Sequence, residues 1–365
     1  MGLGAELRFV DRTRVLCEGR VYLFFAGTDY HRLASHPEVL RAFQEAAGTE
    51  GLSCAGSRVT TGNHPLCVRL EARAAAFLGA GEAALCGSGY LSNTVALESV
   101  QAEFQRFFLQ AGAHPSLAAP AEGLPADRVH RFLGPEELER ALRDHLHPGE
   151  RPLVLTDGVV PGTGELPPLG VYWEAVRELD GRLLVDDSHG LAVVGATGKG
   201  SPEAAGLPAG SFLQTGTFSK GFGAYGGLVA GAAGTRERAA ERSRAFVGAT
   251  PIPPPLAAAA LRAIELLQAQ PALISGLQAR MRAVRARVAG LGFPRSASEA
   301  PILSITHGDA KRNRRLRTRL LKAGIYPPFI NYPGCPPGGH FRFTFSSAHT
   351  DEEVERLLQA IEGSC

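Results

Sequence analysis

The sequence predicts an α/β protein built on a mostly parallel β-sheet that helices cover on both faces. Short, almost continuously apolar runs, such as PLVLTDG at 152–158 and RLLVDDSHG at 182–190, are typical of strands buried on both sides. A segment with helical periodicity, PEELERALRDHL at 135–146, precedes the first of them. The alternation of such strands with helices is the pattern of α/β architectures.

The composition indicates an ordinary globular protein. Of the 365 residues, 44% are apolar and 20% are charged, which excludes a disordered polymer and suits one large domain or two moderate ones. The formal net charge of +2 provides no overall field that would attract nucleic acid or an anionic membrane. No run approaches the roughly 20 apolar residues of a membrane span, so we expect none.

The cysteines give a further hint about the compartment. The six of them form no CxxC pair and no cluster with the spacing of a zinc site, so we expect free thiols and no bound metal. The N-terminus shows no basic start followed by an apolar segment. A cytoplasmic location is therefore the expectation.

The first hundred residues predict three helices and one strand. Residues 36–47 and 67–79 have helical periodicity, and Gly79 suits the C-terminal cap of the second helix. The run EAALCGSGYLSNTVALESV at 82–100 then predicts a short apolar strand, a glycine turn and a helix that begins near Ser92.

Later segments extend the sheet and then change character. Residues 211–223 and 226–231 predict two more strands. A proline cluster after Thr250 leads into a long alanine-rich helix, where one domain would give way to the next. Beyond it, 301–308 and 340–350 predict strands of a smaller sheet, and 351–363 predicts a closing amphipathic helix with acidic residues at its start.

One lysine stands out within QTGTFSKGFGAYGGLVAG, residues 214–231. Lysine occurs only at Lys199, Lys220, Lys311 and Lys322, whereas arginine supplies nearly all the other positive charge. Lys220 lies between a Thr/Ser-rich approach and several glycines. An amine kept where arginine is otherwise preferred indicates chemistry that a guanidinium cannot perform, because an amine can lose its proton and attack a carbonyl.

Polar motifs follow four of the predicted strands, at 87–90, 156–158, 186–190 and 217–220. Strands of such a sheet end in a crevice where ligands collect. The glycine turn at 87–90 has two interpretations: its backbone amides and the following helix would bind a phosphate, or the turn is purely structural. The dinucleotide fingerprint fails because Ser92 stands where a third glycine is required, and such a turn alone is more often structural.

The motif VDDSHG places a carboxylate at the end of a buried strand, where it needs a cationic partner or strong donors. Asp186 would face a protonated pyridine nitrogen, with His189 near a ring substituent. Alternatively, the two residues form a satisfied Asp/His pair or a divalent metal site. Pyridoxal phosphate would explain three motifs together. Its contacts would be a Schiff base with Lys220, the ring nitrogen on Asp186, and the phosphate near Gly89, Tyr90 and Thr217.

Four stretches carry a resemblance to a known family: TGTFSKGFGAYGG, VDDSHGLAVVGATGKG, SGYLSN and FRFTFSSAHT. They resemble the α-oxoamine synthases, class-II aminotransferase-like enzymes of fold-type I that use pyridoxal phosphate to condense an amino acid with an acyl thioester and release carbon dioxide. The resemblance begins at about FAGTDYHRLASHPEV and runs to the C-terminus.

The resemblance implies a large domain with a mostly parallel seven-stranded sheet between helices, and a smaller α/β C-terminal domain. We expect an N-terminal arm and part of the small domain at 1–48, the large cofactor-binding domain at 49–262 and the small domain at 263–365. It also implies a homodimer with its active site at the subunit interface.

The resemblance assigns roles to individual residues. Lys220 would form the Schiff base and act as acid and base, Asp186 would keep the pyridine protonated, and His189 would hydrogen-bond the ring's phenolic oxygen. His114, in AGAHPSL, would stack on the ring face, and Arg342 would bind the substrate carboxylate with its two-pronged donor geometry. The phosphate would be held by Ser88, Gly89, Tyr90 and Thr217, and by Thr250 of the neighbouring subunit.

Some of these residues have simpler interpretations from local sequence alone. His114 would be a loop residue before Pro115, Arg342 would pair with a structural acid, and Thr250 would be a turn residue. The basic segment DAKRNRRLRTRLLKAG, from Asp309, would meet phosphates of coenzyme A or an acidic acyl carrier protein, or would form the solvated face of a helix.

Three departures from the family pattern bear on the substrates. The chain reads TDGVVPGTG, so Pro161 replaces the serine that contacts the cofactor and Thr163 replaces an acid. Gly334 and Cys335 stand where some members carry a substrate-binding threonine, and the family's SNDY element has become AGTDY. We expect cofactor binding to survive these changes.

Three functions follow as hypotheses. The leading one is an acyltransferase that condenses an amino acid with an acyl thioester, on coenzyme A or an acyl carrier protein, to give an α-amino ketone with loss of carbon dioxide. A second keeps the cofactor but is an aminotransferase or an aldolase-type lyase. A third is a non-catalytic partner subunit, which would have no use for the Lys220 amine.

Overall fold

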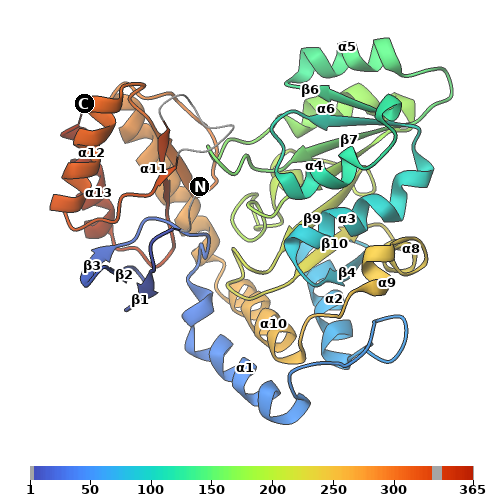
Figure 1. The fold of residues 1–365 in the computed structure, drawn as a ribbon, viewed down its shortest axis with the longest axis horizontal. Coiled ribbons are helices and arrows are strands. Elements are labelled where there is room, and N and C mark those ends of the chain that lie inside the picture. Colours follow the sequence, from blue (N-terminus) through green and yellow to red (C-terminus); the bar gives the residue numbers. More distant parts are fainter. Residues whose placement is uncertain (1–3, 331–338, 365) are drawn as a thin grey trace.

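A seven-stranded sheet forms the centre of the larger part of the molecule (Figure 1). The computed structural model describes residues 4–330 and 339–364. The strand order is β4-β10-β9-β8-β7-β5-β6; pairings from β9 to β6 are parallel, whereas β10 is antiparallel to both neighbours. The strands are β4 (Glu82–Cys86), β5 (Arg106–Gln110), β6 (Val129–Phe132), β7 (Pro152–Asp157), β8 (Arg182–Asp186), β9 (Phe212–Thr217) and β10 (Gly227–Gly231).

Helices cover both faces of this sheet, because successive strand residues point to opposite sides. The helices of this part are α1 (Pro37–Glu50), α2 (Pro65–Leu78), α3 (Gly89–Val100), α4 (Pro115–Glu122), α5 (Pro135–His145), α6 (Leu169–Val176), α7 (Ser201–Ala204), α8 (Thr235–Arg242), α9 (Arg244–Gly248) and α10 (Pro254–Ala269). Ala84 and Leu155 pack with residues of α3, α4 and α8 on one face. On the other face, Leu85 packs with α2 and α10, and Val154 packs with α5 and α6.

A second, smaller sheet lies beside the first part (Figure 1). Its strands β11 (Ile302–Ile305), β13 (His340–Thr344) and β12 (Phe329–Ile330) pair antiparallel in that order, and α11 (Ala272–Gly290), α12 (Ala310–Lys322) and α13 (Asp351–Glu362) accompany them. The N-terminal strands β1 (Arg8–Phe9), β2 (Arg14–Cys17) and β3 (Arg20–Leu23) join this part. The Leu23 N–H donates to the Gly324 carbonyl at 2.8 Å, and the Thr344 N–H donates to the Phe25 carbonyl at 2.9 Å.

The predicted fold class is confirmed, and most predicted elements lie where the sequence places them. Gly79 ends α2 with a φ of 68°, in the left-handed region. One predicted helix start was wrong, because α3 begins at Gly89 rather than near Ser92. The Ser88 hydroxyl accepts the Leu91 N–H at 3.2 Å and so caps the helix three residues earlier. Within the described ranges, no helix combines the length and apolar character needed to cross a bilayer.

We propose that the chain divides into the three segments expected from its sequence, 1–48, 49–262 and 263–365. The hydrophobic cluster around α11, α12 and α13 includes Leu23, Phe25 and Tyr30, which supports grouping the N-terminal arm with the small domain. Position 262 lies within α10, which precedes α11 at the passage between the two parts (Figure 1).

A buried ion pair anchors α2 to the sheet and makes a stability prediction. The Arg58 guanidinium donates to both Glu71 carboxylate oxygens at 2.9 and 2.8 Å, and the Leu85 N–H donates to the same carboxylate at 3.0 Å. We expect Glu71→Gln to destabilise the protein by about 3–5 kcal/mol, because it leaves the Arg58 charge buried and uncompensated. The shift of the unfolding midpoint in denaturant measures this.

The matched control is the exposed pair of Arg177 and Glu174, at 2.9 Å. Glu174→Gln should cost less than about 1 kcal/mol, because exposed pairs are screened by solvent. Equal midpoint shifts for Glu71→Gln and Glu174→Gln would show that burial of the Arg58 charge does not matter to stability.

Candidate active site

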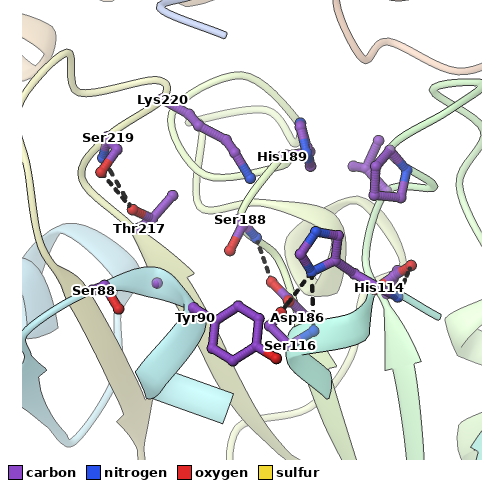
Figure 2. A pocket seen from close by; sticks show the side chains of 14 residues that line it. Ser88, Tyr90, His114, Ser116, Asp186, Ser188, His189, Thr217, Ser219 and Lys220 are labelled. Atoms are coloured by element: carbon purple, nitrogen blue, oxygen red, sulfur yellow. Dashed lines mark hydrogen bonds between the residues drawn. The ribbon is translucent and has the colours of Figure 1, made fainter. Parts of the chain in front are cut away.

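A cavity of about 240 Å³ lies at one edge of the large sheet, where the carboxyl ends of several strands meet. Ser88 follows β4, Asp157 ends β7, Asp186 ends β8 and Thr217 ends β9. In Figure 2, Lys220 and His189 reach in from one side, and Asp186, with Ser116 and Ser188, lies toward the other. The lining comprises Ser88, Gly89, Tyr90, His114, Ser116, Asp157, Val159, Pro161, Asp186, Ser188, His189, Thr217, Ser219 and Lys220.

Lys220 lies in the turn between β9 and β10. The turn is closed by bonds from Phe218 N–H to the Gly226 carbonyl at 2.9 Å and from Gly223 N–H to the Lys220 carbonyl at 3.0 Å. Gly223 has a φ of 60°, and a Cβ there would meet the Ala34 nitrogen at 2.3 Å, so only glycine fits. Burial lowers the pKa of Lys220 to about 8, although the Asp186 carboxylate acts in the opposite direction.

Asp186 is 5% exposed and is held by three donors. Its carboxylate accepts from Asn93 Nδ2 at 2.6 Å, Ser116 Oγ at 3.3 Å and the Ser188 N–H at 3.1 Å. The Thr215 hydroxyl donates to Asn93 Oδ1 at 2.5 Å, which fixes the orientation of the Asn93 amide. The carboxylate is therefore rigidly placed at the floor of the cavity.

His114 caps α4 and does not belong to a loose loop. The His114 backbone N–H donates to the Asp157 carboxyl at 3.1 and 3.2 Å, and its Nδ1 accepts the Ser116 N–H at 3.2 Å. Burial lowers the pKa of His114. Burial also raises the pKa of Asp157 to about 8, and the nearby Asp186 charge adds to that rise. Two carboxyls and a neutral imidazole thus share one wall of the cavity.

The start of α3 lies beside Thr217 and offers a polar end to the cavity. Gly89 begins the helix, and a Cβ there would meet Thr217 Cβ at 2.6 Å, so the helix start and β9 approach closely only because of glycine. The Thr217 hydroxyl donates to the Gly226 carbonyl at 2.8 Å and also bonds Ser219 Oγ at 3.0 Å. Amides at a helix start favour an anionic group. Tyr90, 54% exposed, lies at the rim.

Two predicted residues lie outside this lining. Thr250 borders a small separate cavity with Gly87 and Arg58, so one chain alone does not bring it to Lys220. Arg342, on β13, reaches the rim, where its Nε donates to the carbonyl of the lining residue Pro161 at 2.6 Å. The two altered positions Gly334 and Cys335 lie outside the described residues.

Several lining or supporting residues had no predicted role. Asn93 lies within the SGYLSN motif and Asp157 within the TDG motif. Both motifs were identified from the sequence, so they could have pointed to these two residues. Tyr30, whose hydroxyl bonds His189 Nδ1 at 2.7 Å, stands in the AGTDY element. The remaining lining residues without a predicted role are Ser116, Val159, Ser188 and Ser219.

The basic segment forms α12, with Asp309 as its N-cap. Its buried residues are Asn313, Leu316 and Leu320, whereas most of its cationic residues are exposed. None of its residues belongs to the lining of the cavity. The helix therefore forms a positively charged surface beside the small sheet. It does not take part in the cavity that contains Lys220.

Comparison with known proteins agrees with the fold. The profile of the family "Aminotransferase class I and II" matches residues 24–361, and the chain belongs to this family. It is 35% identical to the 8-amino-7-oxononanoate synthase of Methylocella silvestris over 95% of this chain and 98% of that one. It is 32% identical to the enzyme of the same name from Trichlorobacter lovleyi, over 99% and 93% of the two chains.

Solved structures give the same result at the level of the fold. The serine palmitoyltransferase of Sphingomonas wittichii superposes with a TM-score of 0.88 at 25% identity, covering 97% of this chain and 90% of that one. The 8-amino-7-oxononanoate synthase of Francisella tularensis superposes with a TM-score of 0.77 at 21% identity, covering 94% and 97%. The resemblance to the α-oxoamine synthases is thereby confirmed.

Proposed function

We propose that the protein is a pyridoxal-phosphate-dependent acyltransferase that condenses an amino acid with an acyl thioester, with loss of carbon dioxide, to give an α-amino ketone. The observation that carries this proposal is the convergence of the Lys220 amine and the Asp186 carboxylate on one cavity. The similarity of this chain to 8-amino-7-oxononanoate synthases, over nearly its whole length, supports the choice of reaction.

The residues around the cavity fit this cofactor. Lys220 would hold its aldehyde carbon covalently, since a pKa of about 8 leaves roughly a tenth of the amine unprotonated at pH 7, whereas an ordinary lysine amine is almost fully protonated there. Asp186 would face the ring nitrogen, His189 the ring oxygen and His114 the ring face. The phosphate would lie against Ser88, Gly89, Tyr90 and Thr217. When bound, the cofactor supplies an electron sink for the carbanion that forms beside the substrate nitrogen.

The protein's own groups would then bind the substrate and move protons. Arg342, at the cavity rim, would bind the amino acid's carboxylate through the guanidinium nitrogens that Pro161 leaves free. The Lys220 amine, with a pKa near the working pH, can both accept and return a proton at the substrate carbon. Asp186, fixed by Asn93 and Ser116, would keep a positive charge on the ring nitrogen.

A homodimer with shared active sites is part of the proposal. Thr250 does not reach the cavity of its own chain, and in a dimer it would contact the phosphate in the neighbouring subunit. The exposed apolar side chains Val59 and Val68 border a surface hollow that Arg58, Arg236 and Phe246 also line. Such a surface suits burial between subunits.

We also propose a cytoplasmic location.

The reaction is tested by pairing amino acids with acyl thioesters carried on coenzyme A or on an acyl carrier protein. We expect at least one pair to release free thiol and carbon dioxide in equal amounts. Each condensation breaks one thioester bond and one bond between the amino acid's α-carbon and its carboxylate. Amination of a keto acid without any thiol release would instead support an aminotransferase. Cleavage of a β-hydroxy amino acid without thioester would support a lyase.

The proposal of a non-catalytic partner subunit makes a different prediction. Such a subunit would show no visible cofactor absorption, and Lys220→Ala would leave its spectrum unchanged. We propose catalysis rather than this role because the Lys220 amine is buried beside Asp186, an arrangement that a scaffold does not require.

A further inference from the structure

Tyr30 connects two parts of the proposed site and lies behind the cavity wall. Its ring is 1% exposed, and it follows β3 in the segment that leads to α1. Its hydroxyl lies 2.7 Å from His189 Nδ1, and the positive charge of Arg342 is close enough to act on the pKa of that hydroxyl. The Arg342 side chain is itself held by the Pro161 carbonyl, to which its Nε donates at 2.6 Å.

The chemistry of these three side chains fixes where the protons lie. A guanidinium has no acceptor, so the Tyr30 hydroxyl cannot donate its proton to the nearby Arg342. Burial raises the pKa of Tyr30, so the hydroxyl keeps its proton. Among the described residues, His189 Nδ1 is the one acceptor within hydrogen-bond distance of that hydroxyl, and leaving the proton buried without an acceptor would be costly.

The consequence is a defined tautomer of His189. Burial holds the pKa of His189 well below its usual value, so the ring is neutral and carries one proton. Since Nδ1 accepts from Tyr30, that proton is on Nε2. His189 lines the cavity, and within the described part of the chain its Nε2 has no hydrogen-bond partner (Figure 2). The cavity therefore receives a neutral N–H donor.

We propose that Tyr30 is a positioning residue that holds His189 as an Nε2–H donor toward the cofactor's ring oxygen, with the Arg342 charge close to the Tyr30 hydroxyl. The role toward the cofactor rests on the proposed function, whereas the tautomer follows from the protein alone. Tyr30 thereby lies close to both the group that would bind the substrate carboxylate and the group that would contact the ring.

The tautomer is measured by nitrogen NMR of full-length protein labelled with ring-¹⁵N histidine, before and after cofactor removal, with His189→Asn to assign the signals. We expect the wild-type ring to show the Nε2–H pattern in both states. In Tyr30→Phe we expect a mixed or Nδ1–H pattern. An Nδ1–H pattern in the wild-type protein would overturn the proposal without any variant, whatever the protein catalyses.

Steady-state kinetics give a second readout. Tyr30→Phe should raise the KM for the amino acid about tenfold, because the polar group beside Arg342 is lost, and should leave the KM for the thioester unchanged. The control is Tyr172→Phe, a tyrosine that is also 1% exposed but packs against Phe132 away from the cavity. Equal rises in both KM values, or the same change in Tyr172→Phe, would contradict a positioning role.

Discussion

Lys220→Ala is expected to abolish the covalent attachment of pyridoxal phosphate and to lower turnover by more than about 10³-fold, since both the nucleophile and the proton carrier are lost. Borohydride treatment followed by peptide mass spectrometry should find the cofactor on the Lys220 peptide of the wild-type protein. The fold should survive, because the turn that carries Lys220 is closed by backbone hydrogen bonds that alanine retains.

Lys199→Ala is the matched control. Lys199 is another of the few lysines, and it lines a cavity that does not include Lys220. Cofactor found on Lys199, or full activity in Lys220→Ala, would contradict the assignment. The rate of covalent capture should also rise with pH, with a midpoint near 8, because only the deprotonated amine attacks the aldehyde.

Asp186→Asn is expected to lower turnover by about 10³-fold, the order found when a charge-stabilising group is removed from an enclosed site. The variant also has a signature in the cofactor-free protein. The Asp186 carboxylate raises the pKa of Lys220 against the effect of burial, so its loss should lower that pKa below 8. The midpoint of cofactor capture should then move to lower pH.

Asp186→Glu separates charge from placement. It keeps the negative charge, so the capture midpoint should stay near that of the wild-type protein, whereas the longer side chain loses its alignment with Asn93 and Ser116 and turnover should still fall. An unchanged capture midpoint in Asp186→Asn would show that the two side chains do not interact across the cavity.

Much of the fold was predictable because its signals are local. Apolar runs marked β7, β8 and β9, and the polar residues that follow them marked one edge of the sheet. Lys220 was identified because lysine is scarce in this chain. Asp186 was identified because a buried carboxylate is costly unless it has a cationic partner or strong donors. The predicted start of α3 was too late because Ser88 caps the helix and Gly89 is its first residue. Whether Ser88 acts as the cap depends on the orientation of its hydroxyl toward the Leu91 N–H.

The rest of the site depends on contacts between distant segments. Asn93 and Asp186 are brought together only by the stacking of α3 on the sheet, and Tyr30 meets His189 only where the N-terminal arm passes behind the cavity wall. Pro161 lacks the hydroxyl and the N–H that a serine would offer at this position. Its carbonyl nevertheless holds Arg342, and a backbone acceptor leaves no trace in residue type.

The position of β10 has a mechanical consequence. β9 and β10 are neighbouring interior strands joined by residues 218–226, which bear Lys220, and each has a further strand on its other side. Hydrogen bonds from Phe218 to Gly226 and from Gly223 to Lys220 brace this connection between two interior strands. We therefore expect adjustment during turnover to fall to the four-carbon stem of the side chain and to the smaller sheet that carries Arg342, rather than to the backbone at Lys220.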